Sequence, residues 1–163
     1  MAVWQVDFEL VPAQALRSAP QPLGAAVLDA TAWWAGAAPP SDWRTQLDAV
    51  ASRSASRHAD VETGGDEEGN RVEVRSDDGK VRRVLVRVDV RRLDARFGAA
   101  LLTILKRWGA TLVRRDGVIV EPTIAAFAAS LRGSSAWRHA NDTAAWLAAR
   151  ARDDDTHEEP TDR

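Results

Sequence analysis

The chain has 163 residues, no cysteine, 45% hydrophobic and 28% charged side chains, and a formal net charge of -2. This length suits one domain with a substantial core, and the lack of cysteine excludes disulfides, zinc–thiolate sites, iron–sulfur clusters and thiol catalysis. Because 22 basic side chains nearly balance 24 acidic ones, no net field favours nucleic acid or anionic lipid as a direct partner.

Neither a membrane span nor a secretory signal is expected. No apolar run approaches the roughly 20 residues that cross a bilayer. The first nine residues carry acids inside the apolar stretch and no basic region, which is unlike a signal peptide. We therefore expect a cytoplasmic protein that makes no contact with membranes.

The N-terminal residues predict a strand. Residues 3–10 alternate loosely and are rich in β-formers, and Pro12 ends the run. The spacing places four apolar side chains on one face of this strand, namely Trp4, Val6, Phe8 and Leu10.

Two helices are expected next. Residues 24–35 predict a short helix that ends before Pro39-Pro40. A second helix is expected from an N-cap at Ser41 to about residue 55. Its apolar stripe, at the i, i+4 and i+7 positions, consists of Trp43, Leu47 and Val50.

A mobile polar loop and a β-hairpin follow. Residues 56–70 contain several acids and glycines, which is typical of a loop. Residues 72–90 alternate and contain Asp78-Gly79, the dipeptide of a tight hairpin turn. On the return strand one face carries Val84, Val86, Val88 and Val90, and the other carries Leu85, Arg87, Asp89 and Arg91.

The C-terminal part predicts three helices and two short strands. The apolar period of three and four residues indicates a helix from Leu93 to Trp108, with Gly109 after its end. Residues 111–113 and 118–120 are expected to be strands around Asp116-Gly117. A helix begins at Pro122, buries Ile124, Phe127, Ala128 and Leu131, and stops at Gly133. A last helix, capped by Asn141 or Asp142, presents Trp146, Leu147 and Arg150.

This order of elements predicts one α+β domain over residues 1–152. Strand, helix, hairpin, helix and strand in succession are typical of the ferredoxin-like, split-βαβ arrangement, in which helices cover one face of an antiparallel sheet. One or two C-terminal helices are added to it. The acidic tail 153–163 contains no apolar residue and is expected to be disordered.

No group of residues predicts catalysis, a metal or a cofactor. The three histidines lie far apart, and the glycines at 64–69 neither follow a strand nor open a helix. Ser134, Ser135, His139 and Asp142 are close in sequence, but a triad needs side chains that converge from separate elements. We interpret the two serines as residues that satisfy backbone groups after the helix stop at Gly133.

Three features are candidates for binding. The charged row of Arg87, Asp89 and Arg91 is either a solvated face or a surface that docks a partner. Trp33 and Trp34 are adjacent, so they cannot easily both point inward, and one either covers the core or anchors an interface. The third candidate is the acidic group in the loop, which consists of Asp66, Glu67 and Glu68.

Several segments resemble immunity proteins of bacterial polymorphic toxin systems. They are the strand 3–8, the pair Asp42-Trp43, the acidic loop and strand 66–74, the stretch 86–91 and the segment 134–136. This resemblance implies a non-enzymatic cytoplasmic protein that neutralises a cognate toxin by binding it. The motifs are short, and no binding residue is carried over from them.

Two functional hypotheses remain from the sequence. The first is an interaction protein whose acidic residues 60–68 or 153–159 enter a basic toxin site as a phosphate mimic. The second is a small-ligand sensor or enzyme with a pocket on the sheet lined by Trp4, Phe8, Arg87 and Asp89. Homodimerisation through a sheet face is compatible with either hypothesis.

Overall fold

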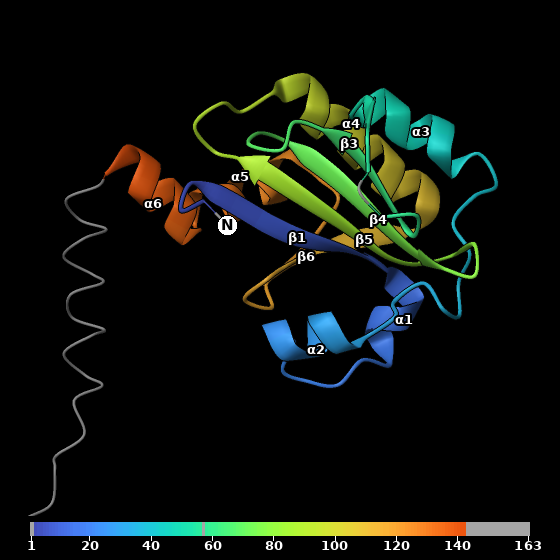
Figure 1. Ribbon diagram of the computed structural model, residues 1–163. Helices are drawn as coiled ribbons and strands as arrows, with labels where there is room; N and C mark the ends of the chain where they lie inside the picture. Colours follow the sequence, from blue (N-terminus) through green and yellow to red (C-terminus); the bar gives the residue numbers. More distant parts are fainter. Residues whose placement is uncertain (1, 57, 143–163) are drawn as a thin grey trace, which may run out of the picture.

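The computed structural model of the protein describes residues 2–56 and 58–142, and within them it has an α+β fold (Figure 1). Seven antiparallel strands form one open sheet in the order β2-β3-β4-β5-β1-β6-β7. The strands are β1 (Gln5–Pro12), β2 (Arg53–Ser54), β3 (Val61–Gly65), β4 (Arg71–Asp77), β5 (Lys80–Asp89), β6 (Ala110–Arg114) and β7 (Ile119–Val120). The helices are α1 (Ala13–Arg17), α2 (Ala25–Ala30), α3 (Trp43–Val50), α4 (Ala95–Trp108), α5 (Ile124–Arg132) and α6 (Ser135–Asn141).

Helices lie on both faces of the sheet rather than on the one face expected. α3 and α4 cover one face (Figure 1), and the rings of Phe8 in β1 and Phe127 in α5 meet there with 5.9 Å between their centroids. α2 lies on the other side, where Asp29 forms an ion pair with Arg83 of β5. The side chain of Leu28 in α2 is also buried. Because a second layer covers part of the sheet, only the remainder of that face is open.

The predicted hairpin is confirmed. β4 and β5 pair antiparallel, and Asp78 and Gly79 between them adopt φ angles of 49° and 73°. These positive angles are the ones that a tight two-residue turn requires. The face directed to the core carries Val84, Val86, Val88 and Val90, all of them buried.

The long helix α4 forms where the apolar period predicts it, although it begins two residues later. The Asp94 carboxylate accepts hydrogen bonds from the backbone N–H groups of Arg96 and Phe97, which fixes the start of the helix. Leu93 therefore lies outside the helix and is half exposed. At the other end Gly109 takes the left-handed conformation expected of a residue after a helix.

The sheet is larger than predicted because β2 lies where the end of a helix was expected and β3 lies where a mobile loop was expected. β2 and β3 pair with each other, and β3 pairs with β4, so that Gly64 lies opposite Val72. The sequence of β3 contains Gly64 and Gly65, residues that are depleted in strands. At position 64 a Cβ atom would lie 2.4 Å from the backbone oxygen of Ala51, so glycine permits a close approach of two segments.

The N-terminal elements are close to the prediction, with shifted ends. β1 begins at Gln5 and includes Pro12. The helix expected over 24–35 is shorter, because α2 ends at Ala30. α3 ends at Val50, and Asp42 rather than Ser41 occupies its N-cap position, without a side-chain bond to the helix backbone.

The C-terminal elements differ more. β6 and β7 pair antiparallel around Gly117, as expected. α5 begins at Ile124 after a cap at Thr123, and Ile124 itself is 74% exposed, so its predicted burial is wrong. α6 was not predicted as a helix. The helix expected after Asn141 and the tail 153–163 lie outside the described residues.

Candidate interaction surface

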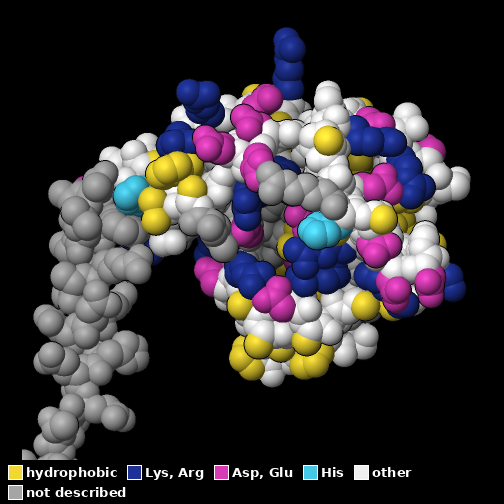
Figure 2. All heavy atoms as spheres, in the orientation of Figure 1, with side chains coloured by type: hydrophobic (Ala, Val, Ile, Leu, Met, Phe, Trp, Pro, Cys, Tyr) yellow, Lys and Arg dark blue, Asp and Glu magenta, His cyan; other side chains and the backbone are white. Residues whose placement is uncertain are grey.

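The face of the sheet opposite the core valines carries alternating charges. Arg87 of β5 donates to Asp7 on the neighbouring β1, with 2.8 Å between Nε and Oδ1, and this bond raises the pKa of Arg87. On β4, Glu73 lies between Arg71 and Arg75 and forms ion pairs with both. On the face seen in Figure 2, basic and acidic side chains likewise alternate, without a wide area of one sign. The charges on this face of the sheet are therefore neutralised by side chains of the same face.

One part of this face is a buried ion-pair network that the sequence did not predict. Arg83 Nη2 lies 2.6 Å from Glu9 Oε2, and only 3% of Glu9 is exposed. Arg83 also bonds Asp29, which forms a second ion pair with Arg115. Burial raises the pKa of Glu9, against the lowering effect of the hydrogen bond from Arg83. The network joins β1, β5, α2 and the residue after β6, and it fixes their positions.

The acidic loop between β3 and β4 is a compact turn whose backbone is tied to the sheet. Asp66 Oδ1 accepts a bond of 3.1 Å from the backbone N–H of Glu68, and Asp66 N–H donates to the backbone oxygen of Asn70. Gln5 of β1 donates to the backbone oxygen of Glu68. The side chain of Asn70 accepts a bond from the backbone N–H of Asp89. These bonds hold the loop against β1 and β5.

The acidic side chains of this loop point to solvent. Asp66, Glu67 and Glu68 are all exposed. Within the described residues, no hydrogen bond or ion pair of the Glu67 or Glu68 carboxylate is found, whereas the carboxylates of the sheet face each have an arginine partner. The loop therefore presents negative charge on a fixed backbone.

Beside this loop, Arg91 is held in one orientation by two neighbours. Its Nη2 lies 2.7 Å from Asp89 Oδ2, and its guanidinium group stacks over the Trp4 ring, 4.0 Å from the centroid. Burial opposes ionisation of Asp89, but the side-chain and backbone hydrogen bonds from Arg91 outweigh it and lower the pKa of this carboxyl group. The bond to Asp89 raises the pKa of Arg91, and the negative charge of Glu68 adds to this effect.

Two open hollows lie on either side of the acidic loop. The first has a volume of about 540 Å³, and its lining includes Asp66, Glu68, Asp89 and Arg91. The second has a volume of about 500 Å³, and its lining includes Glu67 together with residues of β3 and β4. The structure thus brings together five of the predicted binding residues around one loop, which separates two concave surfaces.

Other predicted binding residues lie elsewhere. Arg87 lines neither hollow, because it pairs with Asp7 farther along the sheet. Trp33 and Trp34 are both buried, with 3% and 4% exposed, so the expectation that they cannot both point inward is wrong. Trp34 Nε1 donates to the backbone oxygen of Leu10, and its ring meets Trp108 edge to face. Both tryptophans are part of the core and offer no interface anchor.

The ligand pocket considered from the sequence is not formed. Phe8 lies opposite Val86 and faces the core helices, whereas Arg87 lies opposite Asp7 on the other face. These side chains cannot line one cavity, because neighbouring strand residues point to opposite faces.

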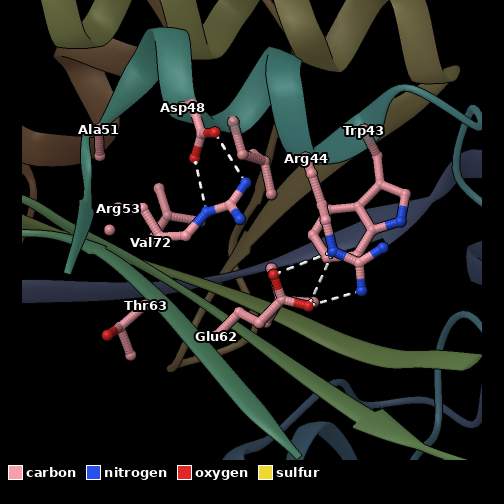
Figure 3. A pocket seen from close by; sticks show the side chains of 11 residues that line it. Trp43, Arg44, Asp48, Ala51, Arg53, Glu62, Thr63 and Val72 are labelled. Carbon is pink, nitrogen blue, oxygen red and sulfur yellow. Dashed lines mark hydrogen bonds and ion pairs between the residues drawn. The ribbon is translucent and has the colours of Figure 1, made fainter. Parts of the chain in front are cut away.

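A narrow cleft between α3 and the sheet has a structural role (Figure 3). Arg44 pairs with Glu62 and Arg53 pairs with Asp48 at its mouth, and the Arg44 guanidinium group stacks on Trp43. Its volume of about 20 Å³ is enough for about one water molecule. The cleft is where α3 attaches to the edge of the sheet.

The residues near Gly133 have the structural role that the sequence indicates. Ser134 caps α6, since its hydroxyl accepts from Trp137 N–H and donates to the backbone oxygen of Leu131. Among residues 2–56 and 58–142, no cluster of three or more histidines and carboxylates is placed to hold a metal ion.

Comparison of the chain with protein-family models, curated proteins and solved structures gave no match. No helix in the described part of the chain combines the length and the hydropathy needed to cross a bilayer. The function is therefore inferred from the surface itself.

Proposed function

We propose that this chain is a non-enzymatic cytoplasmic protein that acts by binding another protein, and that the acidic loop contacts a basic surface of that partner. The observation that carries this proposal is the exposed pair of Glu67 and Glu68, whose carboxylates lack arginine partners among the described residues, on an anchored loop. Fixed charges of this kind favour a complementary surface without the cost of ordering a mobile segment.

The partner that best fits this surface is a toxin domain that acts on nucleic acid. Such a domain has a basic active site, where adjacent carboxylates take the place of phosphates. The two hollows beside the loop would receive protruding parts of the partner, with Arg91 held by Asp89 and Trp4 as an oriented donor at the rim. This assignment agrees with the resemblance of several sequence segments to toxin-immunity proteins.

We also propose a ferredoxin-like core for the fold. The support is the order of the four central strands, β4-β5-β1-β6, all antiparallel, together with α3 and α4 on one face. In this interpretation β2, β3 and β7 extend the sheet at its two edges. The acidic loop then belongs to the extension, since it connects β3 to β4.

The test is a pair of double charge reversals. E67K/E68K changes the exposed carboxylates and leaves Asp66, whose side chain holds the turn, in place. D77K/E121K is the matched control, because both acids are exposed and lie outside the acidic loop and both hollows, and the change in net charge is the same. Each variant is titrated by calorimetry at low and high salt against the protein encoded by the neighbouring gene, which is tested as the candidate partner.

We expect E67K/E68K to weaken binding at low salt and to flatten its salt dependence, while D77K/E121K binds as the wild type does. For a toxin partner, co-expression should restore growth with the wild type and the control, and not with E67K/E68K. Equal affinities of both variants would refute a role for the loop. A shift of the unfolding temperature by a nucleotide or metabolite panel would instead favour a small-ligand protein.

A further inference from the structure

A second surface, on the opposite face from the charged row, is an apolar groove. It has a volume of about 300 Å³ and lies between the start of α4 and the helices α5 and α6. Its walls include Leu93, Leu102, Ile124, Phe127, Leu131 and Trp137. By volume the groove holds about ten water molecules.

The rim of this groove exposes apolar side chains that a folded chain normally covers. Ile124 is 74% exposed and Leu93 is 50% exposed, although they are far apart in sequence. Ile124 is the first residue of α5 and follows the cap Thr123, whereas Leu93 precedes Asp94, the cap of α4. Two large aliphatic side chains at one apolar hollow indicate a surface that packs against something else.

The chain itself continues from this place with apolar residues. Trp137 of α6 lines the groove, and Asn141, one turn later, donates to its backbone oxygen at the end of the helix. The sequence beyond Asp142 contains six consecutive apolar residues, Ala144–Ala149, among them Trp146 and Leu147. The five residues from Asp142 to Leu147 span roughly 7 Å as a helix and roughly 17 Å when extended.

We propose that the segment Ala144–Ala149 docks into this groove, with Trp146 and Leu147 against Leu93 and Ile124. The segment is covalently attached beside the groove, so its effective concentration there is in the millimolar range, which no free partner matches. Docking removes one tryptophan and three aliphatic side chains from water. The groove is then covered by the chain's own C-terminal part. It borders the first hollow beside the acidic loop, because Asn70, Asp94 and Phe97 line both.

The absence of cysteine makes a direct test possible in the full-length chain. Ile124→Cys places a single thiol on the rim of the groove, and its alkylation rate is measured with and without the additional change W146S/L147S. Ile119→Cys is the matched control, because Ile119 is an exposed residue of β7 that does not line the groove. Circular dichroism confirms that all variants are folded.

We expect the thiol of the Ile124→Cys variant to react several-fold more slowly when Trp146 and Leu147 are present. The thiol of the Ile119→Cys control should react at one rate in both backgrounds. Equal rates for the Ile124→Cys variant in the two backgrounds would overturn the proposal. Protection that disappears on dilution would place the segment of a second copy in the groove and would also overturn it. The measurement needs no partner, so its outcome is independent of the proposed binding function.

Discussion

Glu9 of β1 and Arg83 of β5 form an ion pair inside the protein, with 2.6 Å between Oε2 and Nη2 and with 2% and 11% of their side chains exposed. These residues are 74 positions apart in sequence and lie on adjacent strands. Most other ion pairs of the described residues have at least one well-exposed member, and such pairs contribute little to stability. The Glu9–Arg83 pair is therefore where a single substitution should have a large effect.

The first prediction is that Arg83→Met lowers the free energy of unfolding by about 3 kcal/mol at neutral pH, because it leaves the buried Glu9 carboxylate without a charged partner. Replacing both members, as in E9L/R83L, should recover most of this loss, since an apolar pair avoids the desolvation of two charges. Urea denaturation measures both effects.

The matched control for this prediction is Asp77→Asn, which removes the partner of Arg82 at an ion pair where 62% of the aspartate side chain is exposed. We expect a change below about 1 kcal/mol there. An Arg83→Met variant as stable as this control would show that the buried pair contributes nothing to stability.

The second prediction concerns pH. Although burial opposes it, the hydrogen bonds from Arg91 lower the pKa of Asp89 in the folded state below its ordinary value of 3.8. The resulting stabilisation is fully present above pH 3.8, the ordinary pKa, and is lost as the pH falls through the lower pKa of the folded state. Asp89→Asn should thus cost about 1.5 kcal/mol at neutral pH, and the difference from the wild type should shrink below pH 3.8.

The pKa of Glu9 shifts in the opposite direction from that of Asp89, so the two groups change stability in opposite directions across the acidic range. The pKa of Glu9 is raised by burial, so the folded state binds the proton more tightly, and stability falls as the pH rises from the ordinary glutamate value of 4.5 through the folded-state pKa. Denaturation curves of the wild type and Asp89→Asn across this acidic range cancel the Glu9 contribution. A difference between them that is independent of pH would contradict the assignment to Asp89.

The third prediction compares two tryptophans. Trp34→Phe removes the indole N–H that bonds the backbone oxygen of Leu10 at 2.9 Å in the core, and the unpaired oxygen should cost about 1–3 kcal/mol. Trp4→Phe removes a buried indole N–H that has no hydrogen-bond partner within the described residues. It should therefore cost less than about 1 kcal/mol, mainly from weaker stacking with Arg91. Thermal unfolding of both variants measures the two losses of stability. A larger loss for Trp4→Phe than for Trp34→Phe would contradict the prediction.

Elements with local sequence patterns were predictable. The β4–β5 hairpin has a period of two and a turn dipeptide, and α4 has a stripe of large apolar residues followed by Gly109. β3 was not predictable, because its pairing with β4 depends on the contact of Gly64 with a distant backbone segment. The burial of Trp34 depends in the same way on Leu10 and Trp108, far away in sequence.

For the candidate site, the residue types were predictable and their arrangement was not. The acids 66–68 and the pair of Asp89 and Arg91 stand out in the sequence as charged groups. Their proximity comes from the bond between Asn70 and the backbone of Asp89 and from the bond between Gln5 and the loop. Both are single side-chain bonds between distant segments, which leave no periodic pattern in the sequence.

The last prediction tests the close approach that adds β3 to the sheet. At position 64 a Cβ atom would lie 2.4 Å from the backbone oxygen of Ala51, and a backbone atom cannot move aside cheaply. Gly64→Ala should therefore lower the free energy of unfolding by about 1–3 kcal/mol. At Gly36 a Cβ atom would meet nothing within 4 Å, so Gly36→Ala should leave stability unchanged or raise it by less than about 1 kcal/mol. Urea denaturation distinguishes the two, and equal stabilities would mean that the edge strands do not pack as tightly against Ala51 as the fold requires.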